Sequence, residues 1–196
     1  MGYSTIADYK KTLINNGFKV TLIDAGDAIQ GTTIGTLSKG EYIAQIIDKA
    51  GYDIAVPGNH EFDFGMSNFL GLASKVKYKY LSCNFIDLKT NKTVFDPYKI
   101  VEYNGYKVAC IGISTPETFT KSTPSYFQDD KGNYIYSFAE GNNGQALYST
   151  VQSSIDKAKA EKADYIVAVG HVGTDIGLSI PANTMFAGID NVIDAQ

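Results

Sequence analysis

The sequence of 196 residues contains no tryptophan, only two cysteines and only two histidines. Cys83 and Cys110 stand in apolar segments and lack the short spacing of a zinc site, so we expect two buried free thiols. No stretch approaches the roughly 20 consecutive apolar residues that a membrane-spanning helix needs. The first residues also lack the basic and then apolar pattern of a secretory signal. The composition therefore predicts neither a disulfide framework nor a membrane span.

Positive charge is scarce as well. Lysine and arginine together number 17 against 21 aspartates and glutamates, which gives a formal net charge of -4, and the basic residues are scattered along the chain. Non-specific binding to nucleic acid requires clustered cations, so we do not expect a nucleic-acid polymer as a partner. With 44% hydrophobic and 19% charged residues, the chain has the composition of one globular domain with a substantial core.

Apolar strand-like segments alternate with amphipathic helix-like segments along most of the chain. Continuous apolar strands between helices are typical of a sheet covered on both faces, and they predict an α/β fold. The dipeptide Asn104–Gly105 between two apolar runs predicts a β-hairpin, which makes the sheet system mixed. The expected helices are 6–16, 40–51, 66–75 and 142–163, and the expected strands are 18–27, 52–60, 78–85, 98–103, 106–114, 164–175 and 188–196.

Hydrophobic spacing assigns an inner face to two of these helices. Residues 116–142 are rich in aromatic and turn-forming residues and are too long for a simple connection in a compact domain. We interpret them either as a functional loop or lid, or as a surface excursion packed by its own tyrosines. The predicted inner faces are Leu147, Val151, Ile155 and Ala158 in the segment 142–163, and Tyr42, Ile43, Ile46 and Ile47 in the segment 40–51.

Polar residues follow three of the apolar segments at the points where strands are expected to end. Asp27 follows the first, and His171 follows the last. Asn59, His60 and Asp63 follow the one between them. Each residue alone has a simpler explanation as a turn former, a helix cap or a hydrogen-bonded loop residue. Because ligands collect beyond the carboxyl ends of strands in open α/β sheets, we expect the three loops to converge.

The side chains at these tips suit a divalent cation. A carboxylate, an amide oxygen and an imidazole form a mixed oxygen and nitrogen set that fits Mn, Fe, Zn or Mg better than a thiolate-type structural zinc. A glycine precedes Asp27, Asn59 and His171, and glycine lets the backbone turn sharply at a strand end. The pattern therefore favours a metal site.

The motifs "DAGD", "GNHEFDFG" and "GH", in this order, resemble those of the calcineurin-like metallophosphoesterases. The longer matches "GNHEFDFG" and "ISTPETFTKSTP" resemble the 5′-nucleotidase branch, which includes 2′,3′-cyclic-nucleotide phosphodiesterases. The resemblance spans nearly the whole chain. It implies a four-layer sandwich of two mixed β-sheets flanked by helices, two divalent metal ions as cofactors, a small nucleotide as substrate and an extracytoplasmic location.

The resemblance also implies a role for each residue at the strand tips. Asp27 matches the carboxylate that bridges both ions, and Asn59 and His171 match ligands of the second ion. His60 and Asp63 match the catalytic dyad, in which the carboxylate keeps the imidazole protonated. Glu61, the next residue of the "GNHE" motif, is expected to make a structural contact instead.

Some features of the family have no counterpart in these 196 residues. The family begins with a strand that carries D-x-H, and later has a G-H-x-H motif for which Gln196 occupies the position of the first expected histidine. A C-terminal nucleotide-binding domain is also absent. We therefore expect residues 1–196 to be an incomplete catalytic domain, with weak metal loading and little activity by itself.

Three alternatives stay open at this point. The same scaffold can hydrolyse another ester, such as a UDP-sugar or a thiosulfate ester. A non-catalytic binding domain is a second possibility, and Gln196 is the feature that favours it. A nucleotide-binding α/β domain that uses the glycine-rich turns of "GDAIQGTTIG" is the third, although neither Walker spacing nor G-x-G-x-x-G is present.

Overall fold

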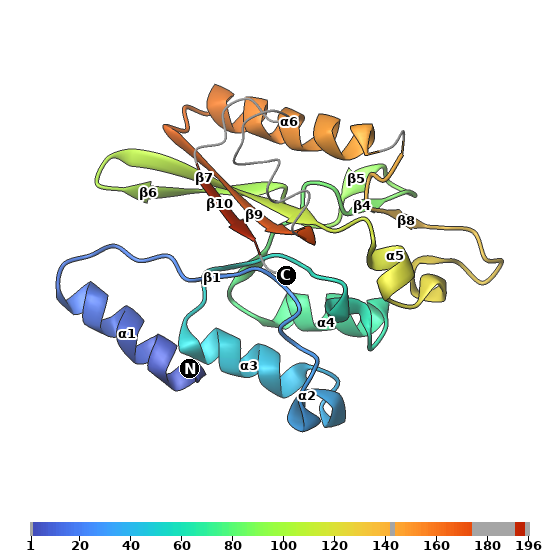
Figure 1. Cartoon of the computed structure of the whole chain (residues 1–196), viewed down its shortest axis with the longest axis horizontal. Helices are drawn as coiled ribbons and strands as arrows, with labels where there is room; N and C mark the ends of the chain where they lie inside the picture. Colours follow the sequence, from blue (N-terminus) through green and yellow to red (C-terminus); the bar gives the residue numbers. More distant parts are fainter. Residues whose placement is uncertain (1, 142–143, 174–190, 195–196) are drawn as a thin grey trace.

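The computed structural model describes residues 2–141, 144–173 and 191–194 (Figure 1). Its helices are α1 (Tyr3–Asn15), α2 (Thr33–Leu37), α3 (Glu41–Ala50), α4 (Met66–Lys75), α5 (Thr118–Lys121) and α6 (Gln145–Ala160), with the 3-10 turns η1 (His60–Phe62) and η2 (Pro124–Phe127). Its strands are β1 (Ile23–Asp24), β2 (Ile54–Ala55), β3 (Lys79–Tyr80), β4 (Ile86–Asp87), β5 (Lys92–Thr93), β6 (Tyr98–Tyr103), β7 (Tyr106–Ser114), β8 (Tyr136–Ser137), β9 (Tyr165–His171) and β10 (Asn191–Asp194).

The described strands form three sheets. The first has the order β1-β2-β3 and is entirely parallel, with Ile23 opposite Ile54 and Ile54 opposite Lys79. The second has the order β10-β9-β7-β6 and is mixed, because β6 and β7 are antiparallel while the other pairs are parallel. A small antiparallel sheet, β5-β4-β8, lies beside them. Of the two large sheets, only the second is mixed among these strands.

The two large sheets face each other between two layers of helices (Figure 1). Apolar side chains of α6 and the second sheet form one core, and a second core, which includes Ile54, Leu81 and Val169, joins the two sheets. A third core lies between the first sheet and helices α3 and α4. The order helix, sheet, sheet, helix confirms the predicted four-layer α/β sandwich.

The inner face of α6 is as predicted, whereas that of α3 is shifted. Leu147, Val151, Ile155 and Ala158 of α6 are all buried. In α3 the buried residues are Ile43, Ala44, Ile47 and Ala50. Tyr42 is 55% exposed, so its assignment to the inner face was wrong. Successive helical residues are separated by about 100° around the helix axis. When the face that contains Ile43, Ala44 and Ile47 is turned toward the core, Tyr42 therefore points toward solvent.

The predicted bounds agree with the structure for some elements and differ for others. The helix predicted at 66–75 has those bounds, and the hairpin has its turn at Asn104 and Gly105, whose φ angles of 52° and 92° suit an Asn-Gly turn. In contrast, the predicted strands 18–27, 52–60 and 78–85 each contain a strand of only two residues. Their remaining residues leave the sheet to form the loops at its ends.

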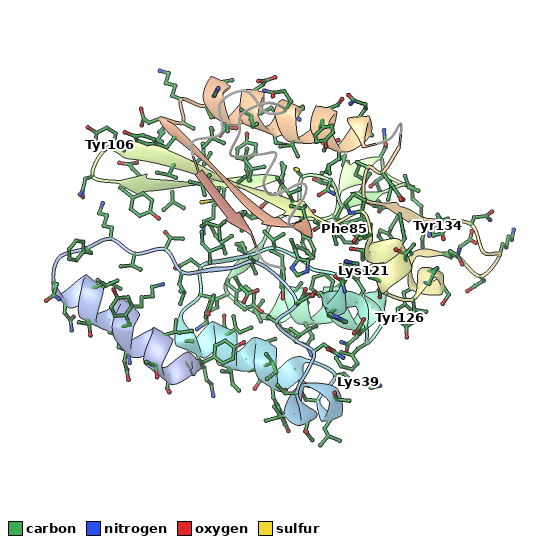
Figure 2. All side chains as sticks on the ribbon, viewed as in Figure 1. Lys39, Phe85, Tyr106, Lys121, Tyr126 and Tyr134 are labelled. Atoms are coloured by element: carbon green, nitrogen blue, oxygen red, sulfur yellow. The ribbon has the colours of Figure 1, made fainter. Side chains whose placement is uncertain are left out.

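Residues 116–141 form an ordered excursion that contains α5, η2 and β8. Phe127 and Phe138 are fully buried in the same core as Phe85, whereas Tyr134 is 48% exposed. Figure 2 shows Phe85 inside the molecule and Tyr134 near its outer edge. The excursion is therefore anchored mainly by phenylalanines, and its tyrosines add to this packing, since Tyr134 contacts Phe119 with ring centroids 5.1 Å apart.

Cys83 and Cys110 are free and buried, as predicted. Within the described part of the chain, no helix combines the length and apolar character that a membrane crossing requires.

Gly112 of β7 marks the closest approach of the two large sheets. A Cβ atom there would lie 2.3 Å from the backbone oxygen of Leu81, which follows β3. We expect Gly112→Ala to lower the free energy of unfolding by about 2–3 kcal/mol, because the two backbones would have to separate. Gly71→Ala in α4 is the matched control, since its Cβ would meet no atom within 4 Å. That change should raise stability by about 0.5–1 kcal/mol. Urea unfolding of both variants measures the difference, and equal stabilities would contradict the packing argument.

Candidate active site

The loop after β1 turns sharply at Gly26 and Asp27, which have φ angles of 100° and 61°. A Cβ atom at Gly26 would lie 2.7 Å from the backbone nitrogen of Gly58, and one at Gly58 would lie 2.3 Å from Asp27 Oδ1. The loops after β1 and β2 therefore touch, and only glycine fits at the two points of contact. This is the local reason for the glycines in "DAGD" and "PGNHE".

Glu61 fastens these two loops together. Its Oε2 accepts hydrogen bonds from the backbone N–H of Asp27 at 2.8 Å and of Gly58 at 2.6 Å. Its Oε1 accepts from the N–H of Ala28 at 2.8 Å and of Ile29 at 3.4 Å. The residue is 1% exposed, and burial raises the pKa of its carboxyl to about 7, although the backbone donors oppose this shift. The expected structural contact of Glu61 is thus present.

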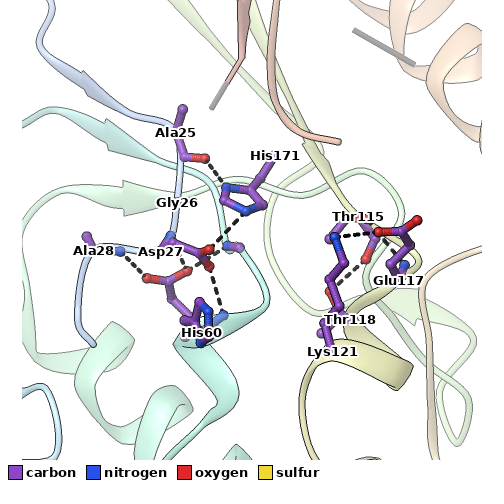
Figure 3. Close-up of polar contacts among 12 residues, drawn as sticks. Ala25, Gly26, Asp27, Ala28, His60, Thr115, Glu117, Thr118, Lys121 and His171 are labelled. Atoms are coloured by element: carbon purple, nitrogen blue, oxygen red, sulfur yellow. Dashed lines mark hydrogen bonds and ion pairs between the residues drawn. The ribbon is translucent and has the colours of Figure 1, made fainter. Parts of the chain in front are cut away.

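Asp27 and His171 lie together although 144 positions separate them in the sequence. His171 Nε2 is 3.1 Å from Asp27 Oδ2, and its Nδ1 donates a hydrogen bond to the carbonyl oxygen of Ala25 at 3.0 Å (Figure 3). Burial lowers the pKa of His171, but the hydrogen bond and charge of Asp27 raise it by more, so the net pKa lies above its usual value. For Asp27, burial raises the pKa, but the hydrogen bonds with His171 and the His60 N–H outweigh it, and the net pKa is lowered.

His60 opens η1 and is held at two points. Its backbone N–H donates to Asp27 Oδ1 at 2.8 Å, and its Nδ1 is 2.6 Å from Asp63 Oδ2. Burial lowers the pKa of His60, but the hydrogen bond with Asp63 and the charge of Asp27 raise it by more. The side chain of His60 is 42% exposed. A protonated imidazole, oriented by a carboxylate and open to solvent, can donate a proton to a bound molecule.

The structure therefore brings the predicted residues to one place. Asp27, His60 and His171 are connected by direct contacts (Figure 3). Asp63 is attached through His60. Asn59 precedes His60 at the start of η1 and is 6% exposed. The predicted roles of the five residues stay predictions. Gln196 and the motif expected around it lie outside the described residues.

The donor set fits a divalent cation. His171 is held by the bond from Nδ1 to a backbone carbonyl, which directs Nε2 toward Asp27, and metal-binding histidines usually have such a partner on the second nitrogen. Asp27 supplies oxygen atoms, and Asn59 can add an amide oxygen. Across the described ranges, no group of three or more His, Cys, Asp or Glu side chains is arranged so that it could hold a metal ion, and the pair Asp27 and His171 is the part of the predicted ligand set in direct contact.

Sequence reasoning missed Asn84, a buried residue after β3. Its Oδ1 accepts from the Ser114 N–H at 2.9 Å, and its Nδ2 donates to the carbonyl oxygens of Ser114 at 2.7 Å and Phe138 at 3.0 Å. Asn84 thereby connects the first sheet, the end of β7 and the excursion. The available signal was its position after the apolar run "KYL", which is the same pattern that singled out Asp27 and Asn59.

A four-layer α/β fold that gathers carboxylate, amide and imidazole groups at its strand tips defines the metallophosphoesterase class of hydrolases. The chain belongs to the calcineurin-like phosphoesterase family, whose model matches residues 2–190. The resemblance noted in the sequence is thus confirmed.

Several known proteins that are longer than this chain are similar to it. The 5′-nucleotidase of Vibrio cholerae is 31% identical in an alignment of 177 residues, which covers 84% of this chain and 29% of that protein. The structure of Haemophilus influenzae NAD nucleotidase is similar with a TM-score of 0.74 and 26% identity, over 100% of this chain and 32% of that chain. Sulfate thiohydrolase SoxB of Thermus thermophilus has a TM-score of 0.79 at 23% identity, over 98% of this chain and 33% of that chain, and shows the fold alone. The chain spans about a third or less of these proteins.

The two raised histidine pKa values predict how stability changes with pH. A histidine with a raised pKa binds its proton more tightly in the folded state, so its stabilisation is complete below the unfolded pKa of about 6.5. That stabilisation is lost as the pH rises through the folded pKa. We therefore expect the free energy of unfolding to fall as the pH rises above about 6.5, measured by urea unfolding in the presence of a chelator.

The control for this pH prediction is the double variant His60→Gln/His171→Gln, which contains no histidine. Glu61, with its pKa raised to about 7, has the same direction of effect, because its proton also favours the folded state. Its influence ends near that pKa. Between that pKa and about pH 8, below the range in which the cysteines of the unfolded chain ionise, the double variant should show little pH dependence, and a slope equal to that of the unchanged chain there would refute the assignment to the histidines.

Proposed function

We propose that this protein is a metal-dependent phosphoester hydrolase that acts on nucleotides, either nucleoside 5′-monophosphates or 2′,3′-cyclic nucleotides. One observation carries the proposal. The two oxygens of the Asp27 carboxylate contact groups from two other strand tips, His171 Nε2 at 3.1 Å and the His60 N–H at 2.8 Å. Such convergence of different polar groups on one carboxylate is typical of a hydrolytic centre.

Asp27, Asn59 and His171 are the residues that would hold the cations. When bound, divalent cations supply positive charge that polarises a phosphoryl oxygen and makes water more acidic. The protein contributes orientation: Ala25 fixes the ring of His171, and Glu61 fixes the loop of Asp27. A rigid donor set of this kind loses little entropy when it binds charge.

His60 and Asp63 would form the acid and base part of the centre. Asp63 holds Nδ1 of the imidazole at 2.6 Å, so Nε2 is the nitrogen that can face a substrate. With its pKa raised, His60 holds its proton more tightly than a free imidazole does, and it can donate that proton to the leaving oxygen of a phosphoester. The neighbouring Asp27 charge adds to this effect, because it favours the protonated imidazole.

The choice of nucleotides as substrates is supported by the names of relatives, which are 5′-nucleotidases and a NAD nucleotidase. Hydrolysis of a UDP-sugar or a thiosulfate ester remains the nearest alternative on this fold. An extracytoplasmic location, which the resemblance implies, belongs to the same proposal. Localisation of the epitope-tagged full-length protein in fractionated cells tests that part.

A non-catalytic binding domain is the alternative of a different class. It is favoured by one observation, namely that no three His, Cys, Asp or Glu side chains of the described ranges are arranged so that they could hold a metal ion. The deciding experiment uses the longest natural polypeptide that contains this chain. We expect about two equivalents of divalent metal, turnover of p-nitrophenyl phosphate, and faster turnover of nucleotides than of UDP-sugars or thiosulfate esters. A metal-free, inactive protein would eliminate the proposal.

Substitutions at the site should separate metal binding from catalysis in that same polypeptide. Asp27→Ala should remove most of the metal and abolish turnover, because the carboxylate of Asp27 would supply oxygen ligands to the cations. His60→Ala should lower kcat by about 100-fold or more while leaving the metal content largely unchanged. Elemental analysis and steady-state kinetics measure the two effects. Full metal content in Asp27→Ala, or loss of metal in His60→Ala, would contradict the assigned roles.

A further inference from the structure

Phe62 ends η1, two residues after His60, and its side chain points into the core. It is 0% exposed and is surrounded by other aromatic rings. Aromatic pairs at such spacings, mostly edge to face, are favourable and restrict how a ring can move. The neighbours of Phe62 are Phe69, Phe85, Phe127 and Phe138, with ring centroids 5.0, 5.4, 5.1 and 5.7 Å away.

Two of these rings, Phe127 and Phe138, come from the excursion at 116–141. They contact each other with ring centroids 5.6 Å apart, and Phe119 packs against both, at 5.1 Å from Phe127 and 5.3 Å from Phe138. The excursion therefore places a compact group of phenylalanines against η1. These phenylalanines contact η1 through Phe62.

Phe138 is itself fixed by polar contacts. Asn84 donates a hydrogen bond to its carbonyl oxygen at 3.0 Å, and the same side chain holds Ser114 at the end of β7. Asn84 is fully buried, so these bonds are shielded from competing water. The phenylalanine group is thus attached to both large sheets and provides a rigid support.

His60 needs such a support. Its ring is 42% exposed, and the side-chain contact described for it is with Asp63, which lies at the end of the same turn. The position of the pair therefore depends on how η1 is held as a unit. Glu61 holds one side of the turn through backbone N–H groups, and Phe62 holds the other side through aromatic packing.

We propose that Phe127 and Phe138, acting through Phe62, are positioning residues for the His60–Asp63 pair. The consequence for catalysis rests on the proposed function, whereas the positioning itself does not. Misplacement of a catalytic group by about 1 Å can lower a rate about 100-fold. The excursion then provides a rigid surface that positions the His60–Asp63 pair, in addition to covering the core.

The test compares Phe127→Leu and Phe138→Leu with Phe95→Leu. Phe95 belongs to the same aromatic core and packs against Phe69, Tyr80 and Phe85, but no ring contact joins it to Phe62 in the described structure. All three variants are compared at a temperature where unfolding curves show them folded. The control therefore reproduces the loss of an aromatic ring without the contact to η1.

The first readout is the NMR signal of the His60 Cε1–H at one fixed pH. The chain has only two histidines, so His60→Gln assigns the signal and His171 serves as an internal reference. We expect the His60 signal to shift or split in Phe127→Leu and Phe138→Leu, with a smaller change at His171, and to stay unchanged in Phe95→Leu. An unchanged His60 signal in both test variants, or an equal change in the control, would overturn the inference.

The second readout is turnover by the longest natural polypeptide. In Phe138→Leu we expect kcat to fall about 10-fold to 100-fold with KM and metal content unchanged, and Phe95→Leu to change kcat less than about twofold. If the His60 signal moves while kcat stays the same, the positioning inference stands and the catalytic role of His60 in the proposed function fails. The two ideas can therefore fail separately.

Discussion

The candidate active site depends on the buried carboxylate of Glu61. It accepts backbone N–H groups from Asp27, Ala28 and Ile29 in one loop and from Gly58 in another, so a single side chain joins the ends of β1 and β2. Burial of a carboxylate is costly unless its oxygens are hydrogen-bonded, and four backbone donors offset that cost. The strained conformation at Asp27 persists because this network holds it.

Both polar and aromatic contacts stabilise the position of η1. Glu61 and Phe62 are consecutive residues that point to different surroundings, one to backbone amides and the other to a phenylalanine cluster. His60 and Asp63 flank them and stay open enough to meet a substrate, with side chains 42% and 22% exposed. A turn fixed on two sides can present an exposed imidazole without losing its geometry.

Much of the fold was predictable because its signals are local or periodic. The bounds of α4, the Asn104–Gly105 turn and the inner face of α6 follow from helical spacing and turn chemistry. Tyr42 was misassigned because hydrophobicity alone does not tell which side of α3 meets the sheet. The position of Asn84 after an apolar run was a local signal, but its partners, 30 and 54 positions away, are set by tertiary packing.

The chemistry available at the strand tips can be read from residue identities alone, namely those of Asp27, Asn59, His60 and His171 and of the glycines before Asp27, Asn59 and His171. The sequence also indicated that these tips should share one edge, because strands of open α/β sheets end together. Only the tertiary structure decided which atoms meet, for example His171 Nε2 with Asp27 Oδ2. The reason is physical: such contacts depend on how separate sheets and loops pack, and packing is a property of the whole chain and not of any segment.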